Sequence, residues 1–273
     1  MTRPTVAILG AGAMGEVLAH GLVAAGWDPA LLVLTARREE RRREVEQSTG
    51  IVCTLDAPAA AKGREVVVVA VKPGDVTALL EACAGTITPD QVVISLAAGV
   101  PTSLYEAVLG PVPVVRAMPN TPAQISRAIT ALAPGAHAGP ESVARADAVL
   151  AAVGETIQLD ESLLDAVTAV SGTGPAYVFL LAEALVEAAI REGLPWHAAE
   201  RLVSRTIAGA GLLLAGSELS PARLRAQVTS PGGTTAAAVH VLEERGFRAL
   251  VEDAVRAAAQ RSREMGDRAG RGS

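Results

Sequence analysis

The chain carries two different hydrophobic patterns, one in each half. Up to about residue 160, short runs of aliphatic and β-branched residues alternate with stretches of helical periodicity. These runs predict strands at residues 6–9, 31–35, 66–71, 92–96, 112–117, 129–132 and 156–159. Strands that alternate with helices are joined by right-handed crossovers in a parallel sheet. The first half is therefore predicted to form a doubly wound α/β domain.

From about residue 163 onward the pattern is helical. Helices are predicted over residues 175–191, 195–214, 221–228, 234–245 and 247–265. Within residues 177–190 only Glu183 and Glu187 are not apolar, and a helix that is apolar nearly all round must be buried nearly all round. A small helical domain buries surface poorly. We expect this helix to be buried against a second copy in a homodimer; the centre of a monomeric bundle is the alternative.

The composition narrows the class of protein. The 273 residues are 50% hydrophobic and 2% aromatic, with a net charge of −5, which argues against nucleic-acid binding. No apolar run reaches the roughly 18 residues of a membrane span, and the first apolar run meets glycines too soon for a signal peptide. Cys53 and Cys83 cannot make a disulfide framework, and no Cys/His cluster has metal spacing. We expect a reduced, soluble, cytoplasmic protein without a metal site.

A glycine-rich motif, Gly10-Ala11-Gly12-Ala13-Met14-Gly15, lies between the first predicted strand and a predicted helix at residues 13–25. In dinucleotide-binding folds the first glycine permits a tight turn, the second admits the pyrophosphate, and the third allows close helix–strand packing. The free N–H groups at the helix start then bind phosphate. We predict that these six residues bind a dinucleotide; a turn shaped by packing alone is the alternative.

The end of the second predicted strand indicates which dinucleotide is bound. An NAD-preferring site usually has a carboxylate there, whereas this chain has Leu34-Thr35-Ala36-Arg37-Arg38 before Glu39. A hydroxyl followed by guanidinium groups suits a 2′-phosphate. We predict NADPH preference, with Thr35 and Arg37 as contacts. Residues 41–43 alternate with glutamates in the helical pattern and are predicted to be a solvated helix face.

Further candidates follow the next predicted strands. Val71-Lys72-Pro73 ends the run of valines, and ligands of such sheets bind outside the carboxyl ends of strands. Lys72 is one of only two lysines among 24 basic residues, although an ordinary surface lysine is the alternative. Ala98 and Asn120 lie in the segments after the next two strands. These segments could line a nicotinamide pocket or simply form turns.

Two loops precede helices in the second half, at residues 171–177 and 228–235. The second loop has two glycines and several hydroxyl residues at a helix start. Exposed N–H groups in such a loop can bind a carboxylate. A plain loop with a threonine N-cap is the alternative.

Together these segments closely resemble the pyrroline-5-carboxylate reductases, which catalyse the last step of proline biosynthesis. The resemblance is carried, in order, by residues 10–15, 71–73, 116–122, 171–177, 228–235 and 246–248. It implies a Rossmann domain over residues 1–161 that binds NADPH or NADH. It also implies an all-α dimerisation domain over residues 162–273, similar to the C-terminal domain of 6-phosphogluconate dehydrogenase. Members of the family are dimers, frequently assembled further into decamers.

The resemblance also implies a reaction and a substrate site. Hydride would pass from NAD(P)H to the C=N carbon of 1-pyrroline-5-carboxylate, giving L-proline. The substrate carboxylate would be bound by a loop that contains Ser230, through the backbone N–H groups of Gly232, Gly233 and Thr234. The Thr235 hydroxyl would act as the catalytic group on the ring nitrogen. Glu161 matches a position that contacts proline in some relatives.

The sequence departs from the family pattern at two positions, and two rival functions are open. Ala57 stands where the family commonly has an adenosine-contacting Asn, and Gln227 stands where some members have Asn; either could alter cofactor affinity. A β-hydroxyacid dehydrogenase would use a lysine on the first helix of the second half, but no lysine follows Lys72. A catalytically silent paralogue that senses a dinucleotide is the other rival.

Overall fold

The computed structural model describes residues 3–271, with side chains described up to residue 266. These residues form two compact units. Unit 1 comprises the chain up to Thr173 together with the segment from Ala257 onward, and unit 2 comprises Gly174–Arg256. The functional boundary predicted at residue 161 stays a prediction.

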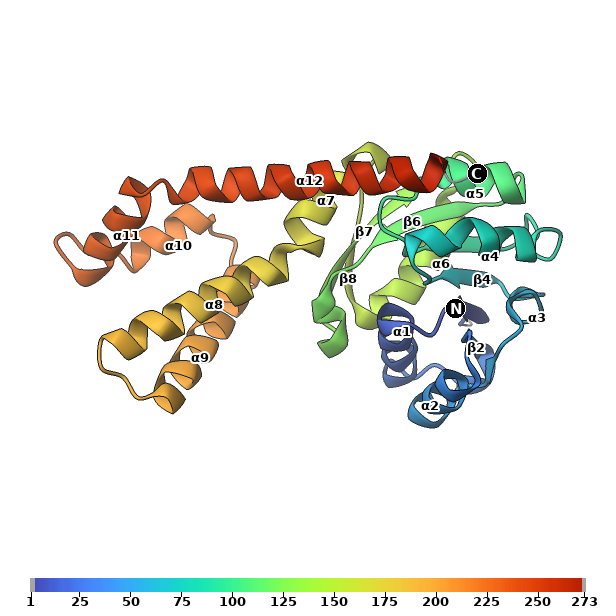
Figure 1. The fold of residues 1–273 in the computed structure, drawn as a ribbon, viewed down its shortest axis with the longest axis horizontal. Helices are drawn as coiled ribbons and strands as arrows, with labels where there is room; N and C mark the ends of the chain where they lie inside the picture. The colour runs from blue at the N-terminus through green and yellow to red at the C-terminus, as the bar shows by residue number, and fades with distance from the viewer. Residues whose placement is uncertain (1–2, 272–273) are drawn as a thin grey trace. The chain divides into compact units, whose positions relative to one another are not determined.

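Unit 1 is built on an eight-stranded sheet with the strand order β3-β2-β1-β4-β5-β6-β7-β8 (Figure 1). The strands are β1 (Val6–Leu9), β2 (Leu32–Thr35), β3 (Cys53–Thr54), β4 (Val66–Val69), β5 (Val92–Ser95), β6 (Val114–Met118), β7 (Ala128–Pro134) and β8 (Gly154–Gln158). The predicted doubly wound α/β fold is confirmed. Strand β3 was not predicted, because two residues are too few to give a hydrophobic pattern.

The sheet departs from parallel pairing at one place. Strands β6 and β7 are antiparallel, whereas every other neighbouring pair is parallel. Only residues 119–127 join β6 to β7. A parallel crossover needs about a dozen residues or more, so this short connection returns the chain in the opposite direction.

Helices cover both faces of the sheet. One hydrophobic cluster joins the strands to α1 (Ala13–Ala24), α2 (Glu39–Thr49) and α6 (Pro140–Leu150), and the other joins them to α3 (Ala57–Ala61), α4 (Val76–Cys83) and α5 (Thr102–Leu109). Val66 and Val68 belong to the first cluster, and Val67 and Val69 belong to the second. A strand between two helical layers is apolar on both faces, which explains the run of four valines in β4.

Short helical segments complete unit 1. They are η1 (Pro29–Leu31), η2 (Pro73–Asp75), η3 (Thr121–Ile125), η4 (Ala151–Val153), η5 (Glu161–Leu163), α7 (Leu164–Val167) and the π-helical turn η6 (Thr168–Gly172). The last part of α12 (Phe247–Arg271) also belongs here. Ser262 on α12 is buried, and its Oγ donates to Asp165 Oδ1 at 2.6 Å. This hydrogen bond anchors the end of α12 to α7.

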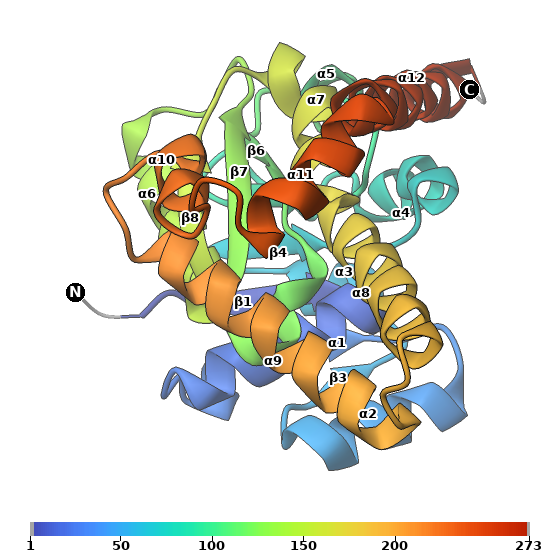
Figure 2. The same cartoon turned by 90° about the vertical axis from the view of Figure 1, so that its left-hand side faces the viewer.

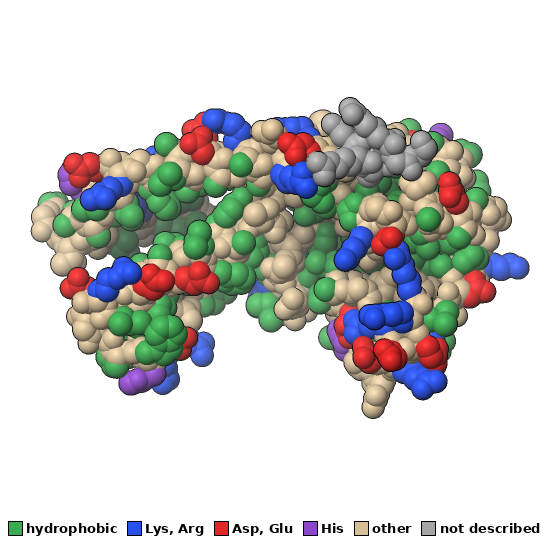
Figure 3. All heavy atoms as spheres, in the orientation of Figure 1, with side chains coloured by type: hydrophobic (Ala, Val, Ile, Leu, Met, Phe, Trp, Pro, Cys, Tyr) green, Lys and Arg blue, Asp and Glu red, His purple; other side chains and the backbone are tan. Residues whose placement is uncertain are grey.

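Unit 2 is helical, with α8 (Gly174–Arg191), α9 (Trp196–Ala215), α10 (Pro221–Gln227), α11 (Thr234–Glu244) and the first part of α12. Helices α8 and α9 form a hairpin (Figure 2). No residue of α8 is buried, and Phe179 and Leu180 are 63% and 66% exposed. Hydrophobic side chains gather on the surface over α8 and α9 (Figure 3). The alternative of a central helix in a monomeric bundle is therefore wrong.

One described helical stretch, Glu161–Arg191, is long and apolar enough to cross a membrane by length and composition alone. It includes α8. The apolar side chains of α8 stay exposed within unit 2, so they need a partner that unit 2 does not provide.

Candidate active site

A cleft of about 870 Å³ opens at the carboxyl ends of β1, β2 and β4. Seven of the predicted dinucleotide contacts line it: Gly10, Ala11, Gly12, Thr35, Arg37, Val71 and Lys72. Six other predicted contacts do not: Ala13, Met14, Gly15, Pro73, Ala98 and Asn120. The sequence did not single out several further lining residues: Ala36, Arg38, Leu55, Ala70, Asp75, Ala78 and Leu79.

The glycine-rich turn has the geometry that a phosphate site requires. Gly10 has φ +115°, and a Cβ there would lie 2.9 Å from Val71 Cγ1. A Cβ on Gly15 would lie 2.1 Å from the Gly10 carbonyl oxygen, so α1 can pack against the turn only without a side chain. Gly12 is the N-cap of α1 and supplies no side-chain cap. The first N–H groups of α1 therefore have no partner within the helix and suit a phosphate.

Thr35 connects the end of β2 to this turn. Its buried hydroxyl accepts a hydrogen bond from the Gly10 N–H at 3.0 Å, and the Ala11 N–H donates to the Thr35 carbonyl at 2.7 Å. The side chain thus positions the glycine-rich turn. Its predicted contact with a 2′-phosphate stays a prediction.

Arg37 lies at the edge of the cleft, in an ion pair. Its Nη2 is 2.6 Å from Asp75 Oδ2. Asp75 lies in η2, on the far side of β1 from Arg37, because β1 is between β2 and β4 in the sheet. Nothing in the local pattern could have revealed this pair, since its members are far apart in the chain.

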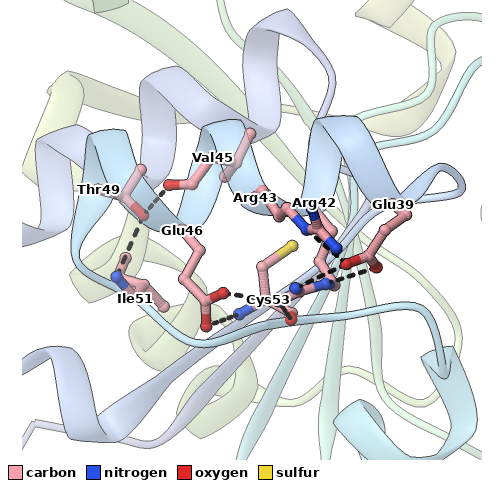
Figure 4. Close-up of polar contacts among 8 residues, drawn as sticks. All are labelled: Glu39, Arg42, Arg43, Val45, Glu46, Thr49, Ile51 and Cys53. Carbon is pink, nitrogen blue, oxygen red and sulfur yellow. Dashed lines mark hydrogen bonds and ion pairs between the residues drawn. The ribbon is translucent and has the colours of Figure 1, made fainter.

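The arginines of α2 differ in role. Arg42 pairs with Glu39 and Glu46, and Arg43 pairs with Glu39 (Figure 4). Arg43 belongs to the solvated face that was predicted, whereas Arg42 is partly buried, with 24% of its side chain exposed.

Arg41 departs from that prediction, because it lines the cleft and is partly buried. Its Nε donates to the Ala11 carbonyl at 2.9 Å, and its guanidinium pairs with Glu16 on α1. Burial opposes ionisation of Glu16, but hydrogen bonds from Arg41 and Ser48 outweigh it and lower the pKa of that carboxyl. Arg41 therefore braces the glycine-rich turn.

Glu161 is held by residues of unit 1. Its carboxylate accepts from the Thr102 N–H at 2.8 Å and from the Thr102 hydroxyl at 2.7 Å. Nη1 of Arg116, a buried residue on β6, lies 3.3 Å from Glu161 Oε1. Thr102 is the first residue of α5, and the preceding Pro101 cannot cap the helix with its side chain. Glu161 thus caps α5 and balances Arg116, while its predicted substrate contact stays a prediction.

Two of the motifs that carry the family resemblance meet within unit 1. Asn120 Nδ2 donates to Ser171 Oγ at 3.3 Å, and Asn120 Oδ1 accepts from the Ile129 N–H at 3.1 Å. Ser171 lies in the π-helical turn η6, and such turns are frequent at functional sites. Ala98, in the loop after β5, is half-buried. The proposed contacts of Asn120 and Ala98 with a cofactor stay predictions.

The loop of unit 2 presents a helix start. Gly233 is the N-cap of α11 and offers no side-chain cap, and its own N–H donates to the Ser230 carbonyl at 3.1 Å. The N–H groups of Thr234 and Thr235 therefore have no acceptor within the helix. Gly232 is exposed in the same turn. The arrangement is able to bind a small carboxylate. Within residues 3–266, no three His, Cys, Asp or Glu side chains are grouped to hold a metal ion.

A doubly wound sheet with this glycine-rich cleft defines the chain as a dinucleotide-binding protein with a separate helical unit. Residues 5–99 match the model of coenzyme F420-dependent NADP oxidoreductases, and residues 161–265 match the pyrroline-5-carboxylate reductase dimerisation domain.

Relatives extend this likeness to the whole chain. Pyrroline-5-carboxylate reductase of Pseudomonas aeruginosa is 41% identical over 272 residues, which cover 99% of this chain and 100% of the relative. A solved structure of the reductase from Coxiella burnetii matches with TM-score 0.91 and 36% identity, covering 97% and 99% of the two chains. The Plasmodium falciparum reductase, solved with NADP bound, matches with TM-score 0.86 and 26% identity, covering 97% and 99%. The chain belongs to the pyrroline-5-carboxylate reductase family.

The dimerisation match bears on the exposed surface of unit 2. It spans α8, whose apolar side chains are unburied in the single chain. The predicted self-association is confirmed, and burial of this surface against the second copy stays a prediction.

Proposed function

We propose that this chain reduces 1-pyrroline-5-carboxylate to L-proline with hydride from NAD(P)H, as the last step of proline biosynthesis. The observation that carries the proposal is the full-length likeness to pyrroline-5-carboxylate reductases, at 41% identity to the relative from Pseudomonas aeruginosa. The glycine-rich cleft of unit 1 and the helix start of unit 2 supply the two kinds of binding group that this reaction needs.

We assign the dinucleotide to the cleft of unit 1. The pyrophosphate would bind at the start of α1, where Gly12 leaves the N–H groups accessible. The adenine would lie against the apolar side chains of Leu55 and Leu79, with Ala57 beside them. NAD(P)H, when bound, supplies the hydride. The remaining contacts are assigned to Ala13, Met14, Gly15, Val71, Lys72, Pro73, Ala98 and Asn120.

Side chains near the adenosine end support a preference for NADPH. Arg37 and Arg38 line the cleft beside Thr35, where a 2′-phosphate would lie. Guanidinium groups bind phosphate oxygens in a bidentate manner. Asp75 is the one carboxylate lining the cleft among the described residues, and it is already paired with Arg37.

The substrate would be held by its carboxylate and its ring nitrogen. The N–H groups of Gly232, Gly233 and Thr234 would bind the carboxylate, with Ser230 in the same loop. The Gly233 N–H would have to exchange its hydrogen bond to the Ser230 carbonyl for the substrate. The Thr235 hydroxyl would accept a hydrogen bond from the protonated ring nitrogen, and Glu161 would contact the ring. As hydride forms the new C–H bond, the π electrons of the C=N bond move to nitrogen and leave a neutral secondary amine. The protonated imine is already electrophilic, so orientation is the main requirement.

The proposal includes assembly and location. We assign the protein to the cytoplasm, with 1-pyrroline-5-carboxylate and a second copy as partners, and with no nucleic acid or membrane partner. The net charge of −5 and the two buried, unpaired cysteines support this assignment. We also propose that the dimers assemble into decamers, as members of the family frequently do.

Pyrroline-dependent oxidation of NADPH, followed at the nicotinamide absorbance with L-proline identified as product, tests the proposal. Activity should survive exhaustive chelation. Thr235→Val should lower turnover and leave NADPH binding unchanged, whereas the control Thr206→Val, on α9, should alter neither. Binding of NADPH with no turnover of the pyrroline would instead identify a dinucleotide sensor. A large loss of NADPH affinity in Thr235→Val would contradict the role given to that hydroxyl.

A further inference from the structure

Asp75 differs in charge from the other ionisable side chains of the cleft. Four basic side chains line the cleft, Arg37, Arg38, Arg41 and Lys72, but among the described residues only one acidic side chain does. The Asp75 carboxylate is 2.6 Å from Arg37 Nη2. Arg37 follows β2 and Asp75 follows β4, and the glycine-rich turn follows β1 between them. The ion pair therefore connects the two loops that flank the phosphate-binding turn.

Among the described residues, the Asp75 carboxylate makes no other ion pair and caps no helix. Asp75 precedes α4 at the N-cap position, but its side chain caps no N–H group of that helix. Arg37 is the one ion-pair partner of Asp75 among the described side chains. The pair is partly exposed, with 67% of the Arg37 side chain and 34% of the Asp75 side chain accessible. Such a pair can be opened by a competing anion, because exposed ion pairs are weak.

We propose that Asp75 is a specificity-determining residue, which competes with the 2′-phosphate of NADPH for the Arg37 guanidinium. This inference rests on the proposed binding of NAD(P)H. A 2′-phosphate must take the Arg37 donors that Asp75 holds, and the released carboxylate then repels the phosphate charge. NADH has no 2′-phosphate and leaves the pair intact. Asp75 therefore narrows the difference in affinity between the two cofactors.

Asp75→Asn removes the charge and keeps the shape. We expect it to bind NADPH up to about fivefold tighter, a range set by the modest strength of exposed ion pairs, with NADH affinity unchanged. Glu81→Gln, which removes a carboxylate from α4, the helix that follows Asp75, but outside the cleft, is the matched control and should change neither affinity. Dissociation constants are measured by nicotinamide fluorescence without pyrroline. The affinities of each variant for adenosine 2′,5′-bisphosphate and for AMP are compared in the same way, because these two ligands differ in the 2′-phosphate and lack the nicotinamide.

An equal change for both cofactors, or no change, would overturn the inference, because a general effect on α4 does not discriminate a 2′-phosphate. A second test of the proposal uses the Arg37→Gln variant. It should weaken NADPH more than NADH, and adding Asp75→Asn to it should strengthen NADPH binding less than the same substitution does in the presence of Arg37. An undiminished gain in the double variant would show that Arg37 is not the group for which Asp75 competes.

These outcomes are separate from those that test the proposed function. Failure to reduce the pyrroline, with the cofactor pattern as expected, would refute the reaction and leave the role of Asp75 standing. Failure to bind either cofactor would refute both. Circular dichroism of each variant shows whether it is folded.

Discussion

Glu161 offers a sharp test of how unit 1 is held together next to its proposed site. Its carboxylate accepts two hydrogen bonds from Thr102 and balances Arg116, whose side chain is only 8% exposed. Glu161→Ala would leave the start of α5 without a cap and Arg116 without its partner. Glu161→Gln keeps an acceptor oxygen for the Thr102 N–H, but it removes the charge and replaces the oxygen that accepts from the Thr102 hydroxyl with an NH2 group.

The expected magnitude follows from these contacts. Removing one partner of a buried ion pair costs about 3–5 kcal/mol, and each lost hydrogen bond to a charged group about 1.5–3 kcal/mol. The two terms overlap, and the 27% exposed Glu161 side chain gives water access to the gap. We therefore expect Glu161→Ala to lower the free energy of unfolding by about 3 kcal/mol. Glu161→Gln should lower it by about 1–2 kcal/mol.

Tryptophan fluorescence in urea measures this change in unit 1 alone. Trp27 is 5% exposed within the core of unit 1, whereas Trp196 is 61% exposed in unit 2. A Trp196→Phe background therefore leaves Trp27 as the single reporter. Arg116→Met combined with Glu161→Ala should recover part of the loss by removing the unpaired charge. A change below about 0.5 kcal/mol in Glu161→Ala, typical of surface substitutions, would show that Glu161 does not hold α5 and Arg116 in place.

Three further predictions address the turn, a buried thiol and the dimer. Gly15→Ala places a Cβ 2.1 Å from the Gly10 oxygen and should weaken NADPH binding more than tenfold in a fluorescence titration. Gly139→Ala, with open space around it, should leave NADPH binding unchanged. Equal NADPH affinities of the two variants would contradict the packing argument. Burial raises the pKa of Cys83 to about 11 from 9.0, so the stability that it contributes is present below pH 9 and is lost as the pH rises toward 11. Urea midpoints should fall over that window, and Cys83→Ala should flatten the fall; a midpoint profile unchanged by that substitution would count against it. Leu180→Glu, on the exposed face of α8, should give a monomer by light scattering, while Val52→Glu, equally exposed in unit 1, should stay assembled; a dimeric Leu180→Glu protein would place the interface elsewhere.

Local pattern predicted the parts of the fold that are governed by local rules. The valine run in β4 and the glycine-rich turn before α1 have unambiguous periodicity and turn chemistry, and both lie where they were expected. Strand β3 and the antiparallel pairing of β6 with β7 were not foreseen, because they depend on neighbours and connection length.

The missed features of the candidate site share one cause. Arg41 contacts Ala11 and Glu16, Asp75 pairs with Arg37, and Thr102 binds Glu161, and each pair is separated by 25 residues or more. Hydrophobic periodicity does not encode such side-chain pairings. Glu161 was singled out through the family resemblance, and the structure adds a role in capping α5 that the resemblance did not supply.

Transfer of a labelled hydride is the most direct test of the proposed reduction. NADPH carrying deuterium on one face or the other of nicotinamide C4 is incubated with 1-pyrroline-5-carboxylate and the protein, and the product is examined by NMR and mass spectrometry. We expect one of the two labels to arrive at C5 of L-proline and the other to stay on the cofactor. L-Proline without deuterium from either label, or no L-proline at all, would contradict it.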